Sequence, residues 1–275
     1  MKIIISRKGF DSQYGGQPSP ILPDGTLLSL PIPLPDDQLG FQQLAYQRKT
    51  YLQIIRELKW NTKIDQHITC HLDPDIRKGA LSTRPLNWKP IFGQCDAAQT
   101  HLKKNSVSAG DLFLFFGWFR QSEEKQGRLQ YLAGSPGVHL VYGYLQIGEV
   151  AACGGPLPAY AKGHAHTRDK YKNTANNCMY ISSDQLSLNN HFNGAGCLRY
   201  HPSLVLTKEG FSRSKWQLPG FFRSLKITYH NEKSFKDDHF QSVAQGQEFV
   251  VEANREALDW AQQLVENNYD APANG

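Results

Sequence analysis

Apolar residues gather in short runs along the chain, and each run is bounded by glycine, proline or polar residues. Short bounded runs of this kind are typical of buried β-strands. The strongest signal is an aromatic-rich run that begins directly after Gly110. The pattern predicts strands over residues 2–6, 27–30, 68–72, 111–120, 138–150, 204–206 and 248–251.

Three other segments space their apolar residues three or four apart, as on one face of an amphipathic helix. They cover residues 41–58, residues 94–103 and a stretch that starts near Asn254, a good helix-capping residue. Most predicted strands are separated by loops rather than by helices, which favours an α+β fold with a mixed or antiparallel sheet. Internal repeats are absent, and we expect one domain over residues 1–275.

The composition is that of an ordinary globular protein, with 40% hydrophobic and 20% charged residues. No apolar run has the length of a membrane span, and the first apolar run is too short for a signal peptide. The five cysteines are odd in number and lack C-x-x-C spacing, so we expect free thiols in a reducing, cytoplasmic compartment. The net charge of +5 indicates only a mild preference for polyanions.

Several motifs of common enzyme chemistries are missing from the sequence. They are the phosphate-binding P-loop, the G-x-G-x-x-G turn, the H-E-x-x-H zinc motif and the His-x-Glu with Pro-Cys-x-x-Cys of zinc deaminases. We therefore expect a protein that uses no cofactor and no metal.

The loop after the first predicted strand, residues 6–16, is the most unusual segment. It combines Lys8, Asp11 and Tyr14 with three glycines, which let a backbone approach a ligand closely. Loops at strand ends are favoured places for functional sites. A turn-rich crossover in which Asp11 binds backbone amides explains the same residues equally well.

Two pairs of polar residues offer further candidates. His71 and Asp73, with Asp75 beyond them, follow a predicted buried strand and could position water or stabilise a cation, although a turn around Pro74 is the alternative. His164 and His166 could share a metal on an extended backbone. Nothing near them in the sequence completes a ligand set, which favours histidines that are solvated or hydrogen-bonded.

Cations and aromatic rings also occur together in a way that suits a nucleic-acid surface, because cations meet phosphates and rings stack on bases. Packing of tryptophan against arginine inside the protein is the alternative. The residues concerned are Arg120, Arg199, Arg213, Lys215 and Trp216.

Several stretches together resemble the third nucleotide-modification-associated domain family. They are SRKGFDS (6–12), YGG (14–16), PSPILPDG (18–25), SLPIP (29–33), LDPD (72–75), FGQ (92–94), AAQTHL (97–102) and GDLFLFFGWFR (110–120). The resemblance spans most of the chain and implies a bacterial or phage protein tied to DNA base modification or to conflict over modified phage DNA. Residues 110–115 and 145–150 also resemble paired strands of PUA-like and EVE-like domains, which implies a partly barrel-like β core with flanking helices.

These observations favour a DNA glycosylase that excises a bulky modified base from double-stranded DNA, in a phage-defence context. Such a hydrolase needs a flipped nucleotide, a base pocket and a carboxylate beside the sugar. Asp11 is the first choice for that carboxylate and Asp73 the second. Lys8 and Arg120 would contact phosphate, His71 would contact the substrate, and the rings of Tyr14, Trp118 or Trp216 would stack on the base.

Two other functions remain open. A base-modifying transferase or accessory enzyme would need a donor pocket, and no donor motif is readable. A non-catalytic reader of the modified base would need no catalytic acid. An Asp11→Asn variant that binds but forms no product would separate an enzyme from a reader.

Overall fold

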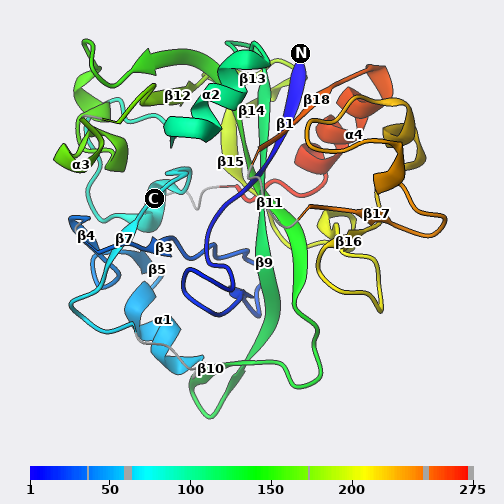
Figure 1. Cartoon of the computed structure of the whole chain (residues 1–275). Helices are drawn as coiled ribbons and strands as arrows, with labels where there is room; N and C mark the ends of the chain where they lie inside the picture. Colours follow the sequence, from blue (N-terminus) through cyan, green and yellow to red (C-terminus); the bar gives the residue numbers. More distant parts are fainter. Residues whose placement is uncertain (36, 59–63, 173, 244–247, 272–275) are drawn as a thin grey trace.

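A nine-stranded mixed sheet runs through the centre of the chain (Figure 1). The computed structural model describes residues 1–35, 37–58, 64–172, 174–243 and 248–271. The strand order is β18-β1-β9-β11-β12-β8, while β2 and β10 also pair with β9, and β15 with β11. The strands are β1 (Lys2–Arg7), β2 (Ser19–Ile21), β8 (Ile91–Gln94), β9 (Leu112–Lys125), β10 (Arg128–Tyr131), β11 (Val138–Ala152), β12 (Cys178–Ser182), β15 (Ala195–Cys197) and β18 (Glu248–Glu252).

The two long strands β9 and β11 form the centre of this sheet, because most of the other strands pair with one of them. β1 and β2 run parallel to β9, and the remaining pairs are antiparallel. The register of β11 against β9 shifts between Val141 and Gly143. β11 therefore pairs with β9 over its first part and with β12 over its last part, which carries the sheet on to β8.

Short strands and turns attach to this sheet and build the loops around it. The strand β7 pairs with both β3 and β4. These elements are β3 (Ile32–Pro33), β4 (Leu39–Gly40), β5 (Ala45–Tyr46), β6 (Lys49–Thr50), β7 (Thr69–His71), β13 (Gln185–Leu186), β14 (Asn189–Asn193), β16 (Lys215–Trp216), β17 (Phe240–Gln241), and the 3₁₀ helices η1 (Lys78–Ala80), η2 (Ala159–Ala161), η3 (Ala165–Thr167), η4 (Pro202–Leu204), η5 (Gly220–Ser224) and η6 (Glu232–Ser234).

The α-helices are α1 (Tyr51–Glu57), α2 (Asp96–Lys104), α3 (Asp169–Lys172) and α4 (Arg255–Glu266). A capping box begins α1. The Thr50 side chain accepts the backbone N–H of Gln53, and the Gln53 side chain accepts the backbone N–H of Thr50. The predicted cap of the last helix is confirmed, because the Asn254 side chain accepts from the Ala257 amide. Each such cap contributes about 1 kcal/mol.

Two large apolar clusters hold these elements together. The first lies on the sheet, where Phe92, Phe113 and Tyr180 pack with ring centroids 4.9 to 5.9 Å apart. The second lies under α1, where Phe10 meets Phe41 edge to face at 5.9 Å. Truncating one of these rings to alanine would cost about 3–5 kcal/mol.

Three predicted elements differ from the structure. The helix predicted over residues 41–58 is a β5–β6 hairpin followed by the shorter α1, because the chain turns at Gln47 with a positive φ of 52°. The strands predicted over 27–30 and 204–206 form only isolated bridges and a 3₁₀ turn. Both segments are buried, so their apolar character reflects packing rather than strand pairing.

The predicted α+β class with a mixed sheet is confirmed, whereas the barrel-like core is not. Among the described strands the sheet is an open path whose ends, β18 and β8, do not pair with each other. No described helix is both long enough and apolar enough to cross a membrane. All five cysteines are free, as their number and spacing predicted.

Candidate active site

Four buried ionisable side chains meet beside strand β8: His71, Asp73, His164 and His166, which we call the histidine–aspartate cluster. His71 ends β7, and the chain turns back at once, because the Asp73 amide donates to the His71 carbonyl at 2.9 Å. His164 and His166 flank the start of η3. Figure 1 shows β7 and the helix α3, which follows η3, on the same side of the molecule.

Asp73 lies at the centre of the cluster, with 5% of its side chain exposed. Its Oδ1 accepts the Gly93 amide at 2.7 Å, so the edge strand β8 holds the carboxylate directly. Burial alone raises the pKa of Asp73, but the His164 hydrogen bond and the neighbouring imidazoles outweigh burial and lower it to about 2. Asp73 is therefore a carboxylate at neutral pH.

His71 is held by a second acid. Its Nδ1 lies 3.0 Å from Oδ2 of Asp37. Burial raises the pKa of Asp37, but the hydrogen bonds from His71 and Gln38 and the charges of His71 and Arg168 together outweigh burial and lower it. An ionised carboxylate can only accept, so Nδ1 carries a proton, and in the neutral form of the ring Nε2 holds the lone pair. The ring stands 5.2 Å from the ring of His166.

His166 is oriented in the same way by an amide. Its Nδ1 lies 2.8 Å from Oδ1 of Asn177, whose Nδ2 donates to the carbonyls of His166 and Tyr171. Because these two bonds fix the amide, Nδ1 of His166 donates and Nε2 keeps its lone pair, 3.9 Å from Oδ2 of Asp73. Burial lowers the pKa of His166 to about 4, so the imidazole is neutral near pH 7.

Two neighbours fix the place of the His166 ring. It stacks on Tyr171 at 4.7 Å and 14°, and its other side lies against the backbone of β8 at Gly93. A Cβ at Gly93 would lie 2.2 Å from Cδ2 of His166. Only glycine at this position leaves room for the imidazole.

His164 completes the cluster. Its Nδ1 accepts the backbone N–H of His166 at 3.3 Å, so the proton of this ring sits on Nε2. That Nε2 lies 3.4 Å from Oδ1 of Asp73, yet among the described residues it finds no well-aligned hydrogen-bond partner. The residue is 6% exposed.

Three atoms of the cluster that could ligate a metal ion lie within 4.8 Å of one another. They belong to His71, Asp73 and His166, one atom from each. Two are imidazole nitrogens with free lone pairs and the third belongs to an ionised carboxylate. Such a set can take a proton from water, hold water or bind a cation. Perturbed ionisable groups gathered in one place are a physical signature of functional sites.

A cavity of about 500 Å³ opens beside the cluster and is lined in part by His166 and Asn177. This volume suits a small organic ligand. Lys162 also lines it and supplies a cation near the entrance, with Thr167 and Thr174 as hydroxyl groups. The cluster therefore has both an ionisable centre and an adjacent space for a substrate.

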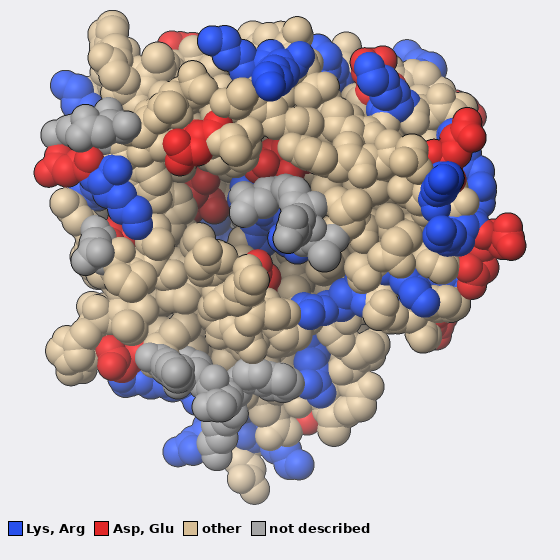
Figure 2. Space-filling model, in the orientation of Figure 1, with Lys and Arg blue, Asp and Glu red and all other residues tan. Residues whose placement is uncertain are grey.

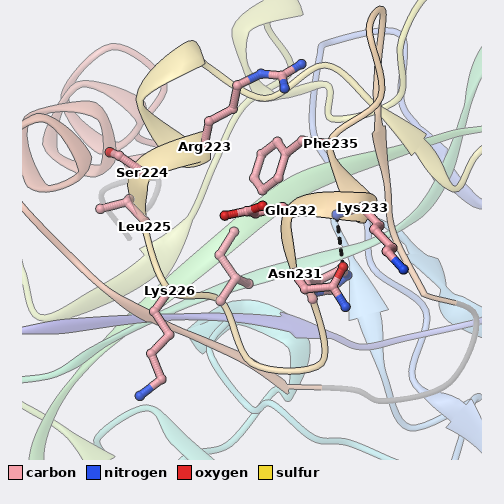
Figure 3. A pocket seen from close by; sticks show the side chains of 10 residues that line it. Arg223, Ser224, Leu225, Lys226, Asn231, Glu232, Lys233 and Phe235 are labelled. Atoms are coloured by element: carbon pink, nitrogen blue, oxygen red, sulfur yellow. Dashed lines mark hydrogen bonds between the residues drawn. The ribbon is translucent and has the colours of Figure 1, made fainter.

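A cavity of about 580 Å³ elsewhere shares no residue with the cluster. It is lined by residues between Arg223 and Phe235, and Figure 3 shows the Lys226 and Lys233 side chains pointing away from its centre. The lining residues Glu232 and Asn231 belong to a capped turn. This cavity has no group of converging ionisable side chains and is the weaker candidate.

The structure separates the two predicted catalytic acids. Asp11 lies in a tight turn, where its Oδ1 accepts the amides of Gln13 and Tyr14 at 2.8 and 2.7 Å. No contact in the described part of the chain joins Asp11 to Asp73 or Arg120. The turn interpretation therefore accounts for Asp11, and Asp73 is the better candidate of the two. Asp75 binds Arg84 through both carboxylate oxygens, at 2.6 and 2.7 Å, which is a structural role.

Two of the predicted substrate-binding residues are engaged inside the protein. Lys8 is partly buried and places its Nζ 2.7 Å from Oε1 of Glu248, with their side chains 9% and 2% exposed. Trp216 packs in the core against Phe116.

Three others remain accessible. Tyr14 is exposed, and Trp118 is partly exposed with the Arg213 guanidinium 3.8 Å from its ring centre. Arg120 donates to the Leu132 carbonyl at 3.2 Å and lines another hollow. Figure 2 shows lysines and arginines scattered over one face among acidic residues, together with a central hollow that contains both charges.

Sequence spacing did not reveal the residues that orient the cluster, Asp37 and Asn177, and gave no sign that His71 and Asp73 lie beside His164 and His166. Their one shared signal is the spacing: His71 with Asp73 and His164 with His166 each stand two residues apart. The ligand set that seemed incomplete around His164 and His166 is supplied by residues more than 90 positions away, which only the fold brings near.

The fold and the cluster define an α+β protein with a buried ionisable centre next to a ligand-sized cavity. The sequence model of nucleotide modification associated domain 3 matches residues 2–252, and the chain belongs to this family, as the resemblance predicted. Comparison with curated proteins and with solved structures finds no match. Membership links the chain to nucleotide modification.

Proposed function

We propose that this protein is a hydrolase that removes a modified base from DNA, and that the histidine–aspartate cluster holds the attacking water. The observation that carries the proposal is the arrangement of two lone-pair-bearing imidazole nitrogens and an ionised carboxylate within 4.8 Å. The low pKa of His166 keeps its imidazole uncharged near pH 7, so the lone pair on Nε2 is available to hold water or a cation.

Hydrolysis of the N-glycosidic bond fits this arrangement better than group transfer does. Water is the second substrate of hydrolysis, so one base-sized cavity is enough, whereas a transferase also needs a donor pocket. The cavity of about 500 Å³ beside His166 is of the right order for a flipped nucleotide. Lys162 in its lining would meet the adjacent phosphate.

Contact with the DNA duplex is supported by a second region. The guanidinium of Arg213 lies over Trp118 and also donates to Ser12 Oγ at 2.9 Å. Burial lowers the pKa of Arg213, and the charge of Asp11 partly offsets this effect. A preformed cation–aromatic pair of this kind can bind a phosphate and a base at little cost in side-chain entropy.

The test uses genomic DNAs that carry different base modifications, with mass spectrometry of released bases and abasic sites. We expect base release from at least one DNA and a loss of at least about 10²-fold in Asp73→Asn and His166→Gln. The exposed His191 gives the matched control, His191→Gln, which should keep the rate.

Three outcomes would contradict the proposal. An altered base that stays in the DNA would indicate a modifying enzyme. Binding without any product would indicate a reader. Base release at the full rate by Asp73→Asn would move the chemistry away from the cluster.

A further inference from the structure

The geometry points to a metal centre: we propose that Nε2 of His71, the carboxylate of Asp73 and Nε2 of His166 bind one divalent transition-metal ion. These atoms come from three residues that lie beside one another and whose donor atoms all fall within 4.8 Å. Metal–ligand distances of about 2.1 Å place ligands of one ion roughly 3 to 4 Å apart. The 3.9 Å between His166 and Asp73 already lies in that range.

The orientation of the two imidazoles is the strongest support. A histidine that ligates a metal donates its other N–H to a carboxylate or a carbonyl oxygen, which fixes the ring and its tautomer. His71 does so to Asp37 at 3.0 Å and His166 does so to Asn177 at 2.8 Å. In each neutral imidazole the lone pair is then on Nε2, and one nitrogen of each ring lies within 4.8 Å of a carboxylate oxygen of Asp73.

The proposed ligand atoms of His166 and Asp73 have no hydrogen-bonding proton between them. Nε2 of His166 and Oδ2 of Asp73 face each other at 3.9 Å, and both are acceptors. A buried acceptor pair of this kind is costly unless a cation or a donor lies between its members. A metal ion satisfies both atoms at once.

His164 supports the same centre from the other side of Asp73. Its buried Nε2 lies 3.4 Å from Oδ1, but the N–H is not aligned for a hydrogen bond to that oxygen or to any other described residue. With Oδ2 on the metal, Oδ1 is the oxygen left to accept from His164 and from the Gly93 amide. His164 is then a positioning residue for the ligand Asp73.

The donor types select the ion. Two imidazoles and one carboxylate suit Zn²⁺ or Fe²⁺, whereas Mg²⁺ and Ca²⁺ prefer oxygen ligands throughout. Three protein ligands leave coordination positions open, as in catalytic rather than structural sites. The inference rests on the proposed function only for the role of the ion, which is to hold and acidify the attacking water.

Binding is measured on the whole chain after chelator treatment and dialysis, with Co²⁺ as a spectroscopic probe and with Zn²⁺, Fe²⁺ and Mg²⁺ by calorimetry. We expect one equivalent of Co²⁺ with ligand-field bands, displaced by one equivalent of Zn²⁺. His71→Gln and His166→Gln should each lose at least about 10²-fold in affinity, and the control His191→Gln should lose none. Asp37→Asn should lose about 10- to 100-fold through the orientation of His71.

Circular dichroism and thermal melts of each variant show whether it folds. If a ligand variant does not fold, the metal affinity of Asp37→Asn still tests the proposal. Binding of Mg²⁺ alone, or of Co²⁺ equally well by His71→Gln and His166→Gln, would overturn the centre. Base release that persists without any metal would leave the hydrolase intact and overturn the role of the ion in it. Bound metal without base release from any DNA would leave the metal centre intact and contradict the hydrolase.

Discussion

The carboxylate of Asp37 lies 3.0 Å from Nδ1 of His71 and fixes which nitrogen of that ring carries the proton. Asp37 and His71 are 34 residues apart and join through the β3–β7–β4 ladder. The pair sets the direction of one lone pair in the cluster. It is the relationship from which the chemistry of the site follows.

Asp73→Asn should abolish turnover, whereas Asp11→Asn should cost much less. The first change removes the charge at the centre of the cluster, where a preorganised group is worth about 10²–10³ in rate. In the second, the asparagine oxygen can still accept the amides of Gln13 and Tyr14, so the turn survives. Single-turnover rates of both variants on one modified DNA decide the matter, and the reverse order would place the site in the 6–16 loop.

Gly93→Ala should inactivate the protein while leaving it folded. The added methyl would lie 2.2 Å from the His166 ring, so the imidazole must leave its place between β8 and Tyr171. Gly79→Ala is the matched control, because a Cβ there meets nothing within 4 Å. Rates and melting temperatures of the two variants are compared. An active Gly93→Ala would show that the ring position is not required.

Acid should destabilise the protein through His139. Burial, together with the nearby positive charges of Arg213 and Arg7, lowers the pKa of His139 to about 3, whereas the unfolded residue titrates near 6.5. Between these values the unfolded chain binds the extra proton, so stability falls as pH falls from about 6.5 toward 3. The limiting slope is about 1.4 kcal/mol per pH unit for this one group.

The measurement is the free energy of unfolding by urea between pH 7 and 4, in wild type and in His139→Asn. Asparagine keeps an acceptor for the Trp216 N–H, which lies 3.2 Å from Nδ1 of His139. The variant should have a shallower dependence on pH. Equal slopes would mean that His139 is not the group that titrates.

Affinity for DNA should fall steeply with salt, by about 10³-fold or more between low and moderate concentrations if several phosphates are contacted. Arg213→Gln should reduce the slope of the salt dependence by about one. The control is Arg255→Gln on α4, where the arginine pairs only with Asp259 one helical turn away. An affinity that does not change with salt concentration would contradict binding to DNA.

The sequence was informative where local pattern decides structure. The aromatic run of β9, the buried β1 and the capped helix α4 were all predicted, because strand alternation and helix caps are local properties. The helix predicted over residues 41–58 was right only for α1 (Tyr51–Glu57). The spacing of Phe41 and Leu44 is helical, yet both residues are buried outside any helix, so tertiary packing overrode the local signal.

The residues of the candidate site were predicted separately, but their proximity to one another was not predicted. His71, Asp73, His164 and His166 were all recognised as unusual, but sequence spacing alone does not reveal that β7 and η3 meet at β8. Asp37 and Asn177 carry no local signature of their role. Trp216 and Lys8 were placed on the surface because residue type suggests contact with nucleic acid, whereas burial depends on the whole fold.

The distance along the chain between the two halves of the cluster has a consequence for synthesis. His71 and Asp73 precede the exposed hairpin tip at Gln126 and Gly127, while His164, His166 and Asn177 follow it. A nascent chain therefore cannot assemble the cluster until about two thirds of it has been synthesised, and a product truncated before that point lacks part of the cluster. Cleavage at the tip would leave the two halves of the cluster on separate fragments, and only reassociation of the fragments would bring them together again.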